Sequence, residues 1–203
     1  MIIPEIEFSH WLVILSVFVS LLGAFAYIRD TIRGKTKPNR VSWFMWAFAP
    51  LLATGAAISA NADLRATVRV FLGGFLPLIV FSDSFVNPKS YWQLGKFDFI
   101  CGALAIVGVI FWGIAGSPRM AILFLAFADG FASLPTIKKA WKNPETETGI
   151  TYIASFLSAL LIVPSIPVWN IENSAFQVYL LAANALLLLG VYRRQIGSLL
   201  NRI

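Results

Sequence analysis

The chain has 203 residues, of which 58% are apolar or aromatic and only 13% are charged, and its mean hydropathy is +0.76. A water-soluble domain of this size has no way to bury so much apolar surface. The composition therefore excludes a cytosolic enzyme, a secreted disulfide-rich domain and a disordered chain. The single cysteine, Cys101, is expected to be a small packing residue. These properties predict an integral membrane protein.

Seven apolar stretches follow one another along the chain, and each is close to the roughly 20 residues that a spanning helix needs. They cover 11–29, 41–60, 67–86, 97–115, 119–137, 149–168 and 173–192. The remaining residues supply only tails and short connections, so no soluble domain is expected. Glu5 and Glu7 precede the first stretch without any Lys or Arg, which is unlike a cleavable signal peptide. The first stretch is therefore predicted to be a retained span.

The positive charges are sorted to one side of the predicted spans. One set of alternate segments holds thirteen of the sixteen Lys and Arg residues: Arg29, Arg33, Lys35, Lys37, Arg40, Lys89, Lys96, Lys138, Lys139, Lys142, Arg193, Arg194 and Arg202. The other set holds Arg65, Arg69 and Arg119. Because positive loops stay in the cytoplasm, we expect a multi-pass protein of a bacterial inner (plasma) membrane, with the N-terminus outside and the C-terminus cytoplasmic. The net charge of +6 then favours contact with anionic lipid, and no nucleic-acid-binding motif accompanies it.

The sequence contains an internal repeat at a shift of 109 residues, which places segment 27–43 on segment 136–152. The first three predicted spans then fall on the last three, and the fourth is unpaired. Because three is an odd number, a single linking helix is needed to give both triplets the same orientation. We therefore predict an all-α membrane protein with three-helix repeats at 11–86 and 119–193, joined by a linker helix at 97–115. Parallel repeats of this kind form transporters whose solute site lies at the repeat interface near the midplane.

The chain resembles the PQ-loop family, which includes the SWEET and SemiSWEET sugar facilitators, in span number, orientation and repeat. The motif of that family is a Pro-Gln pair near the cytosolic end of the first helix of a repeat, then a basic loop and a Gly-x-Ser/Thr entry to the second helix. Segments 134–139 (LPTIKK) and 148–151 (TGIT) fit this outline, although Thr136 replaces Gln. In the first repeat, Ala26 and Tyr27 stand where Pro-Gln is expected. The resemblance implies a divergent transporter with a hinge at Pro135 and Thr136.

Polar residues inside the fifth stretch are candidates for a solute site, because charges at this depth face the bundle interior. Asp129 lies near the middle of the stretch and shares one helical face with Ser133 and Thr136. Its repeat counterpart is Ser20 in the first stretch. Asp129 is expected either to bind a donor group, a cation or a proton, or to hydrogen-bond neighbouring helices as a structural group.

The second, sixth and seventh stretches supply the other candidates. By resemblance, Asn184 is the solute-binding asparagine of the last helix, with an interhelical hydrogen bond as the alternative. Gln177 lies two turns earlier on the same face. Trp46 is placed to stack on a sugar or another ring. Its repeat counterpart is Ser155, and Ser158 follows one turn later.

Acidic residues near the cytosolic side are predicted to have minor roles. Asp98 is expected at the membrane interface or beside loop lysines. Glu145 and Glu147 are expected to contact Lys138 or Lys139 in surface pairs, which contribute little to stability.

The remaining motifs narrow the function. One histidine and one cysteine do not make a metal cluster, and no Walker A loop is present, so no metal, cofactor or enzymatic activity is expected. The predicted function is alternating-access transport of a small polar solute, sugar-like by resemblance, with an amino acid or a vitamin as alternatives. The rival is a ligand-binding receptor or scaffold on the same fold, as in the KDEL receptors. A monomer is expected to be sufficient for function, and a homo-oligomer is the alternative.

Overall fold

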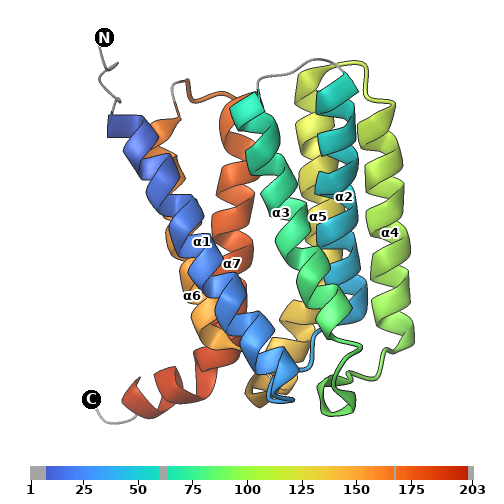
Figure 1. Ribbon diagram of the computed structural model, residues 1–203, viewed down its shortest axis with the longest axis vertical. Helices are drawn as coiled ribbons and strands as arrows, with labels where there is room; N and C mark the ends of the chain where they lie inside the picture. The colour runs from blue at the N-terminus through green and yellow to red at the C-terminus, as the bar shows by residue number, and fades with distance from the viewer. Residues whose placement is uncertain (1–7, 60–63, 167, 201–203) are drawn as a thin grey trace.

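The computed structural model describes residues 8–59, 64–166 and 168–200, and this part of the chain is helical without any β-strand (Figure 1). Its seven α-helices are α1 (Phe8–Ile32), α2 (Arg40–Ser59), α3 (Leu64–Asp83), α4 (Lys96–Gly113), α5 (Pro118–Lys142), α6 (Gly149–Ile162) and α7 (Ile171–Leu200). Short 3-10 turns lie in the connections: η1 (Pro88–Ser90), η2 (Pro144–Thr146) and η3 (Val163–Ser165). The seven predicted helices are confirmed, and four of them, α1, α4, α5 and α7, are long and apolar enough to cross a membrane.

Several helix ends differ from the predicted ones, and proline explains two of the differences. Helix α6 ends at Ile162 instead of 168, because Pro164 has no N–H to continue the helical hydrogen bonds and the chain tightens into η3. Helix α5 continues past 137 to Lys142 and ends before Asn143, which Pro144 keeps out of the helical region. Helix α7 continues past 192 to Leu200, and its last turns bend away from the bundle (Figure 1).

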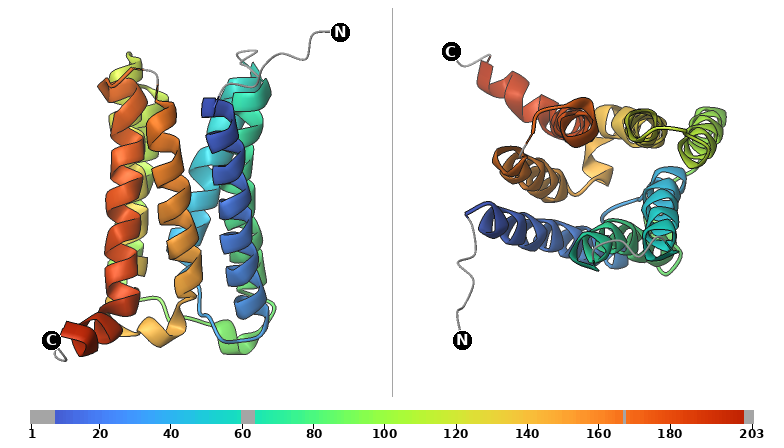
Figure 2. Two further views of the ribbon diagram at one scale, coloured as in Figure 1. Left: turned by 90° about the vertical axis from the view of Figure 1, so that its left-hand side faces the viewer. Right: turned by 90° about the horizontal axis from the view of Figure 1, so that it is seen from above.

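The helices form two facing layers (Figure 2). In one layer α3 packs against both α1 and α2, and in the other α7 packs against both α5 and α6. The layers meet where α1 packs on α6 and where α2 packs on α5. Helix α4 lies at the edge, against α5 and α2. The third helix of each predicted triplet therefore lies between the other two.

The two ends of the bundle differ in charge. Connections 33–39, 84–95 and 143–148 gather at the end where α7 finishes, which we call the basic end (Figure 1). The described members of the larger basic set lie there, whereas Arg119 lies at the opposite end, where α5 begins. Arg202 lies outside the described residues, and the structure does not describe the side chains of Arg65 and Arg69.

Many large apolar side chains point outward, and most of the buried residues are small or polar. Phe18 and Phe25 on α1 are 57% and 66% exposed, and Ile110 on α4 is 57% exposed. The buried apolar residues include nine alanines: Ala47, Ala49, Ala105, Ala128, Ala132, Ala140, Ala154, Ala159 and Ala183. A water-soluble bundle has the reverse pattern, because its large apolar residues form the core. Small residues at helix contacts are typical of helices packed in lipid, where close approach of the backbones supplies the attraction.

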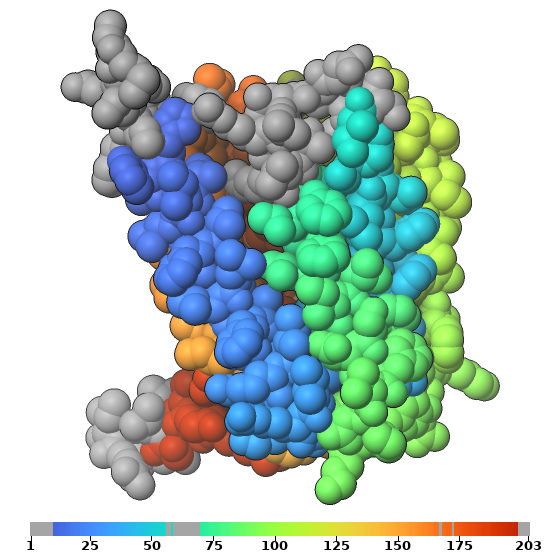
Figure 3. All heavy atoms as spheres, viewed as in Figure 1, coloured from blue at the N-terminus to red at the C-terminus, as the bar shows by residue number. Residues whose placement is uncertain are grey.

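The space-filling view shows the surface hollowed between α1 and α3 at mid-height, with atoms of α7 visible behind them (Figure 3). Toward the basic end, α1 and α3 close together (Figures 1 and 3). Along α1, Ser16 and Tyr27 are buried, whereas Ser20 between them is half-buried. Most of the described side chains with no exposed surface lie toward the basic end: Tyr27, Thr31, Asn39, Ser42, Val80, Ser84, Ser90, Thr136 and Ala140. The interior is therefore most completely buried at the basic end.

Gly23 determines how closely α1 approaches α6. A Cβ atom at this position would lie 2.6 Å from the Cβ of Ala154, and the Gly23 carbonyl accepts a 2.8 Å hydrogen bond from Thr151 Oγ1. We therefore expect Gly23→Ala to destabilise the protein by about 1–3 kcal/mol through overpacking. Thermal unfolding in detergent measures this change.

Gly73→Ala is the matched control, because a Cβ at Gly73 meets nothing within 4 Å. Alanine favours a helix over glycine by about 1 kcal/mol, so this control is expected to leave the melting temperature unchanged or raise it slightly. Equal effects of the two substitutions would show that the α1–α6 contact has no special demand for glycine.

Candidate functional site

Two polar clusters lie inside the bundle at different heights. The aspartate cluster consists of Asp129, Ser133 and Tyr179 and joins α5 to α7. The lock cluster consists of Lys139, Glu147, Tyr27, Tyr152 and Trp43 and lies toward the basic end. Helix α5 contributes residues to both clusters. Asp129 and Lys139 are ten residues apart along it, which corresponds to about 15 Å.

The aspartate cluster holds a carboxylate on hydroxyl groups. Tyr179 OH donates a 2.6 Å hydrogen bond to Asp129 Oδ2, and Ser133 Oγ, one turn further along α5, donates a longer one of 3.5 Å. The two hydroxyls are 3.1 Å apart. Among the described residues, no Lys or Arg forms an ion pair with Asp129. Since these hydrogen bonds all reach Oδ2, Oδ1 retains its capacity to accept from a solute.

The predicted hinge residues lie between the two clusters. Pro135 and Thr136 are fully buried, and α5 runs through both of them as one helix. Pro135 has no N–H for the carbonyl of Phe131, so one hydrogen bond of the helix is missing here. The Thr136 hydroxyl has no hydrogen-bond partner in the described part of the chain. This turn is therefore the least hydrogen-bonded part of the α5 backbone between Asp129 and Lys139.

Besides Asp129, three of the predicted site residues make hydrogen bonds across helices: Ser20, Ser158 and Gln177. Ser20 Oγ donates to Ser158 Oγ at 2.8 Å, which joins α1 to α6. Gln177 Nε2 donates to the Ala159 carbonyl at 3.0 Å, which joins α7 to α6. The structure thus brings hydroxyl and amide groups of both layers to α6.

The other predicted residues lie apart from these contacts. Asn184 Nδ2 donates at 2.8 Å to the Leu180 carbonyl of its own helix, and no hydrogen bond links Asn184 to Asp129 in the described residues. Trp46 is half-buried, with its ring edge-on to Trp43 at 5.1 Å between centroids. Ser155 is half-buried on α6. Asp129, Asn184 and Trp46 therefore line different parts of the interior in this conformation.

The lock cluster is built on a buried ion pair. Lys139 Nζ lies 2.7 Å from Glu147 Oε1, and the two side chains are 1% and 0% exposed. Glu147 Oε2 accepts hydrogen bonds from Tyr27 OH at 2.9 Å and from Tyr152 OH at 2.7 Å. The predicted contact of Glu147 with Lys139 is therefore present, but its predicted place at the surface is wrong, because the η2 turn that begins at Pro144 folds Glu147 under the ends of α1 and α6.

Backbone and side-chain contacts extend the lock cluster into the first connection. Lys139 Nζ donates to the Lys37 carbonyl, and the Lys37 N–H donates to the Thr146 carbonyl at 3.0 Å. Trp43 Nε1 on α2 donates to Tyr27 OH at 3.3 Å. The connections that follow α1 and α5 are thus tied to each other across the layers.

Asp98 lies at the basic end, where it bonds to backbone and amide groups. It is buried at the start of α4, where Oδ2 accepts the Gly95 N–H at 2.6 Å and Oδ1 accepts Asn39 Nδ2 at 3.0 Å. The Asn39 side chain in turn accepts the backbone N–H groups of Val41 and Ser42 at the start of α2. One carboxylate therefore caps α4 and holds the residue that caps α2.

Sequence reasoning missed Tyr179 and the burial of the Lys139–Glu147 pair. The phenol of Tyr179 lies inside an apolar stretch, and this position could have marked it as an inward-facing polar group. For Lys139, the signal was its position three residues after Thr136, on the inward face of α5, whereas Lys138 points to the outer side and lies over the Phe97 ring. Comparisons of the chain with protein-family models, curated proteins and solved structures find no match.

The buried pair gives a stability prediction. Glu147→Gln leaves the Lys139 ammonium buried without its counter-charge, and Lys139→Met does the same to the carboxylate. We expect each to destabilise the protein by about 3–5 kcal/mol, measured by thermal unfolding in detergent.

Glu145→Gln is the control, because Glu145 forms a 3.9 Å pair with Arg194 and both side chains are more than half exposed. Exposed pairs contribute about 0–1 kcal/mol, so this variant is expected to melt like the wild type. If Glu147→Gln melted like Glu145→Gln, the lock cluster would not hold the basic end together.

Proposed function

We propose that the protein is a multi-pass membrane transporter that moves a small polar solute by alternating access of its two helical layers. The observation that carries the proposal is the packing of two facing layers around interior polar side chains, with a buried ion pair at one end that is hydrogen-bonded to both layers. In this proposal the basic end lies in the cytoplasm, because positively charged loops stay on the cytoplasmic side of a membrane.

The packing of the helices supports two parallel repeats. The shift of 109 residues relates α1 to α5, α2 to α6 and α3 to α7, so it exchanges the α1–α6 contact with the α5–α2 contact. The Gly23–Ala154 contact maps onto Ala132 and Met45, which are buried together in one apolar cluster. Repeats related in this way rock against each other around a central site in known transporter folds.

The difference between the two ends supports a conformation that is open away from the basic end. The lock cluster seals the basic end, whereas Ser20, Ser158, Asp129 and Asn184 are only half-buried above it. The charges and hydroxyls of the lock cluster regain hydrogen bonds from water when they separate. A polar lock of this kind therefore opens at lower cost than its tight contacts suggest.

The chemistry of the interior favours a solute with several donor groups. Asp129 Oδ1 accepts from a hydroxyl or an ammonium, and the Asn184 amide and the Ser20–Ser158 hydroxyls both donate and accept. A sugar suits this set, as the PQ-loop resemblance implies. An amino acid or an amine-bearing vitamin suits Asp129 as well, because the carboxylate lacks a counter-charge among the described residues.

Counterflow in liposomes tests the proposal. The purified chain is reconstituted and assayed with labelled sugars, amino acids and vitamins, and we expect uptake of one class. Asp129→Asn removes the charge but keeps the shape, and Asn184→Leu removes the amide. Each is expected to lower counterflow about tenfold or more, as loss of a hydrogen bond to a charged or buried group would.

Glu145→Gln, which removes an exposed carboxylate, is expected to retain wild-type counterflow. Solute binding without counterflow would reject transport and favour a receptor on the same fold. Counterflow that both site variants leave intact would keep transport and reject Asp129 and Asn184 as the solute site.

A further inference from the structure

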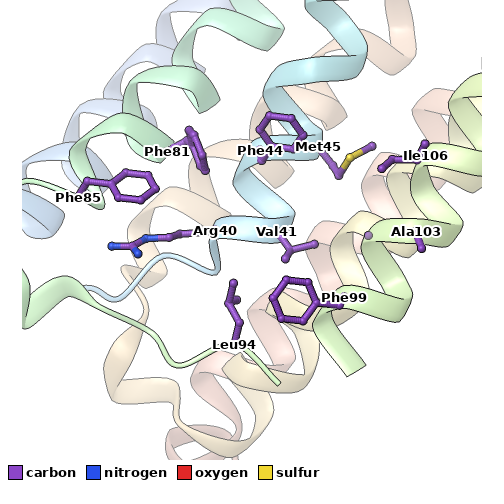
Figure 4. A pocket seen from close by; sticks show the side chains of 11 residues that line it. Arg40, Val41, Phe44, Met45, Phe81, Phe85, Leu94, Phe99, Ala103 and Ile106 are labelled. Atoms are coloured by element: carbon purple, nitrogen blue, oxygen red, sulfur yellow. The ribbon is translucent and has the colours of Figure 1, made fainter. Parts of the chain in front are cut away.

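A groove runs along the outer face of α2, between α3 and α4. Its larger part encloses about 470 Å³ and lies at the basic end (Figure 4). Arg40 and Phe44 of α2 contribute to it, with Phe81 and Phe85 from α3 and Phe99 from α4. Apart from Arg40, the side chains that line this part are apolar.

The groove continues along α2 into a second hollow of about 250 Å³, which shares Phe44 with the first. Phe48, Leu52 and Leu78 line this continuation. From Arg40 to Leu52 the helix rises about 18 Å. Half of a hydrocarbon core that is about 30 Å thick measures about 15 Å, so the groove spans the depth of one leaflet.

Arg40 is held at the basic end of the groove with unused donors. Its Nε and one Nη donate to Ser84 Oγ at 3.1 Å and to the Ser84 carbonyl at 2.7 Å. The guanidinium lies 3.8 Å from the centroid of the Phe85 ring. It forms no ion pair with a described carboxylate, and hydrogen bonds to its second Nη are absent among the described residues. A fixed guanidinium with free donors is well suited to a phosphate group.

The surroundings of Arg40 favour an anionic ligand. Lys89 is exposed in the 84–95 connection, and Lys96 is exposed at the start of α4, directly after it. The other basic connections lie at the same end of the bundle. The cytoplasmic leaflet carries anionic lipids that are attracted to such clusters. Lipid tails are as apolar as the groove, so the hydrophobic effect does not hold a chain there. Retention must come from the shape of the groove and from the charge at its end.

We propose that this groove binds one anionic phospholipid of the leaflet at the basic end, with an acyl chain along α2 and the phosphate on Arg40. The inference rests on the membrane location in the proposed function but does not require transport. It assigns a role to the linker helix α4, which forms one wall of the groove.

Native mass spectrometry of the full chain in detergent tests the proposal, with phosphatidylglycerol and phosphatidylcholine of identical chains as probes. We expect one phosphatidylglycerol to bind about tenfold more tightly than phosphatidylcholine. Arg40→Gln is expected to abolish this preference, and Arg40→Lys to retain part of it. Ala103→Trp, which places an indole in the groove from the exposed face of α4, is expected to reduce binding of both lipids.

Arg33→Gln is the control, because Arg33 is an exposed cation at the same end but outside the groove. It should leave the preference intact. Arg40→Gln also removes two hydrogen bonds to Ser84, so melting temperatures accompany the binding data, and Ala103→Trp tests the groove without this loss.

Equal binding of the two lipids by the wild type, or phosphatidylglycerol binding that Ala103→Trp leaves unchanged, would overturn the proposal. Dissociation of a dimer by Ala103→Trp, without loss of lipid, would overturn it in favour of a second copy of the chain. Because lipid binding is measured without solute, its loss is distinct from a failure of counterflow.

Discussion

The arrangement of the basic end depends on the buried ion pair between Lys139 and Glu147. Two opposite charges this deeply buried are tolerated only when further hydrogen bonds complete their coordination, and here Tyr27, Tyr152 and the Lys37 carbonyl do so. These partners come from α1, α6 and the connection after α1. The geometry of that one pair therefore fixes how the first and second layers meet at this end.

Away from the ion pair, the layers approach through small side chains. Gly23 against Ala154 between the layers, and Gly108 against Ala128 where α4 packs on α5, allow close helix contact that a larger residue at either glycine would prevent. Contacts of this kind are shallow and apolar, so they permit one helix to move on another at little cost, whereas the lock cluster has a defined hydrogen-bonded geometry. The bundle thus has a specific hydrogen-bonded contact at one end and shallow apolar contacts along its length. This arrangement suits the rocking motion proposed for the two layers.

The sequence was sufficient to predict the seven helices, because each apolar stretch is long and its ends carry charges, prolines or glycines. It also identified Asp129, Ser133, Ser20 and Ser158 as inward-facing groups, because helical periodicity places them on shared faces. It did not predict the burial of Glu147, which depends on the η2 turn folding beneath two helices distant in sequence. The Asp129–Tyr179 contact likewise requires knowing that α5 and α7 are neighbours, and the groove on α2 requires knowing that α4 lies at the edge of the bundle.

Helix α5 connects the solute chemistry to the lock. Asp129 and Ser133 lie on one side of Pro135, and Lys139 lies on the other, one turn beyond Thr136. Because Pro135 removes a backbone hydrogen bond, the turn between the two clusters resists bending less than the rest of the helix. In the proposed cycle, a solute that draws Asp129 away from Tyr179 shifts the part of α5 that precedes Pro135. The helix bends at Pro135 and Thr136, and Lys139 moves as a result. Because Lys139 and Glu147 are both buried, moving the ammonium away from the carboxylate leaves two desolvated charges without their partner, which favours full separation and entry of water. Helix α5 is the one helix that carries residues of both clusters. Binding of solute at Asp129 is therefore coupled, through α5, to separation of the lock cluster.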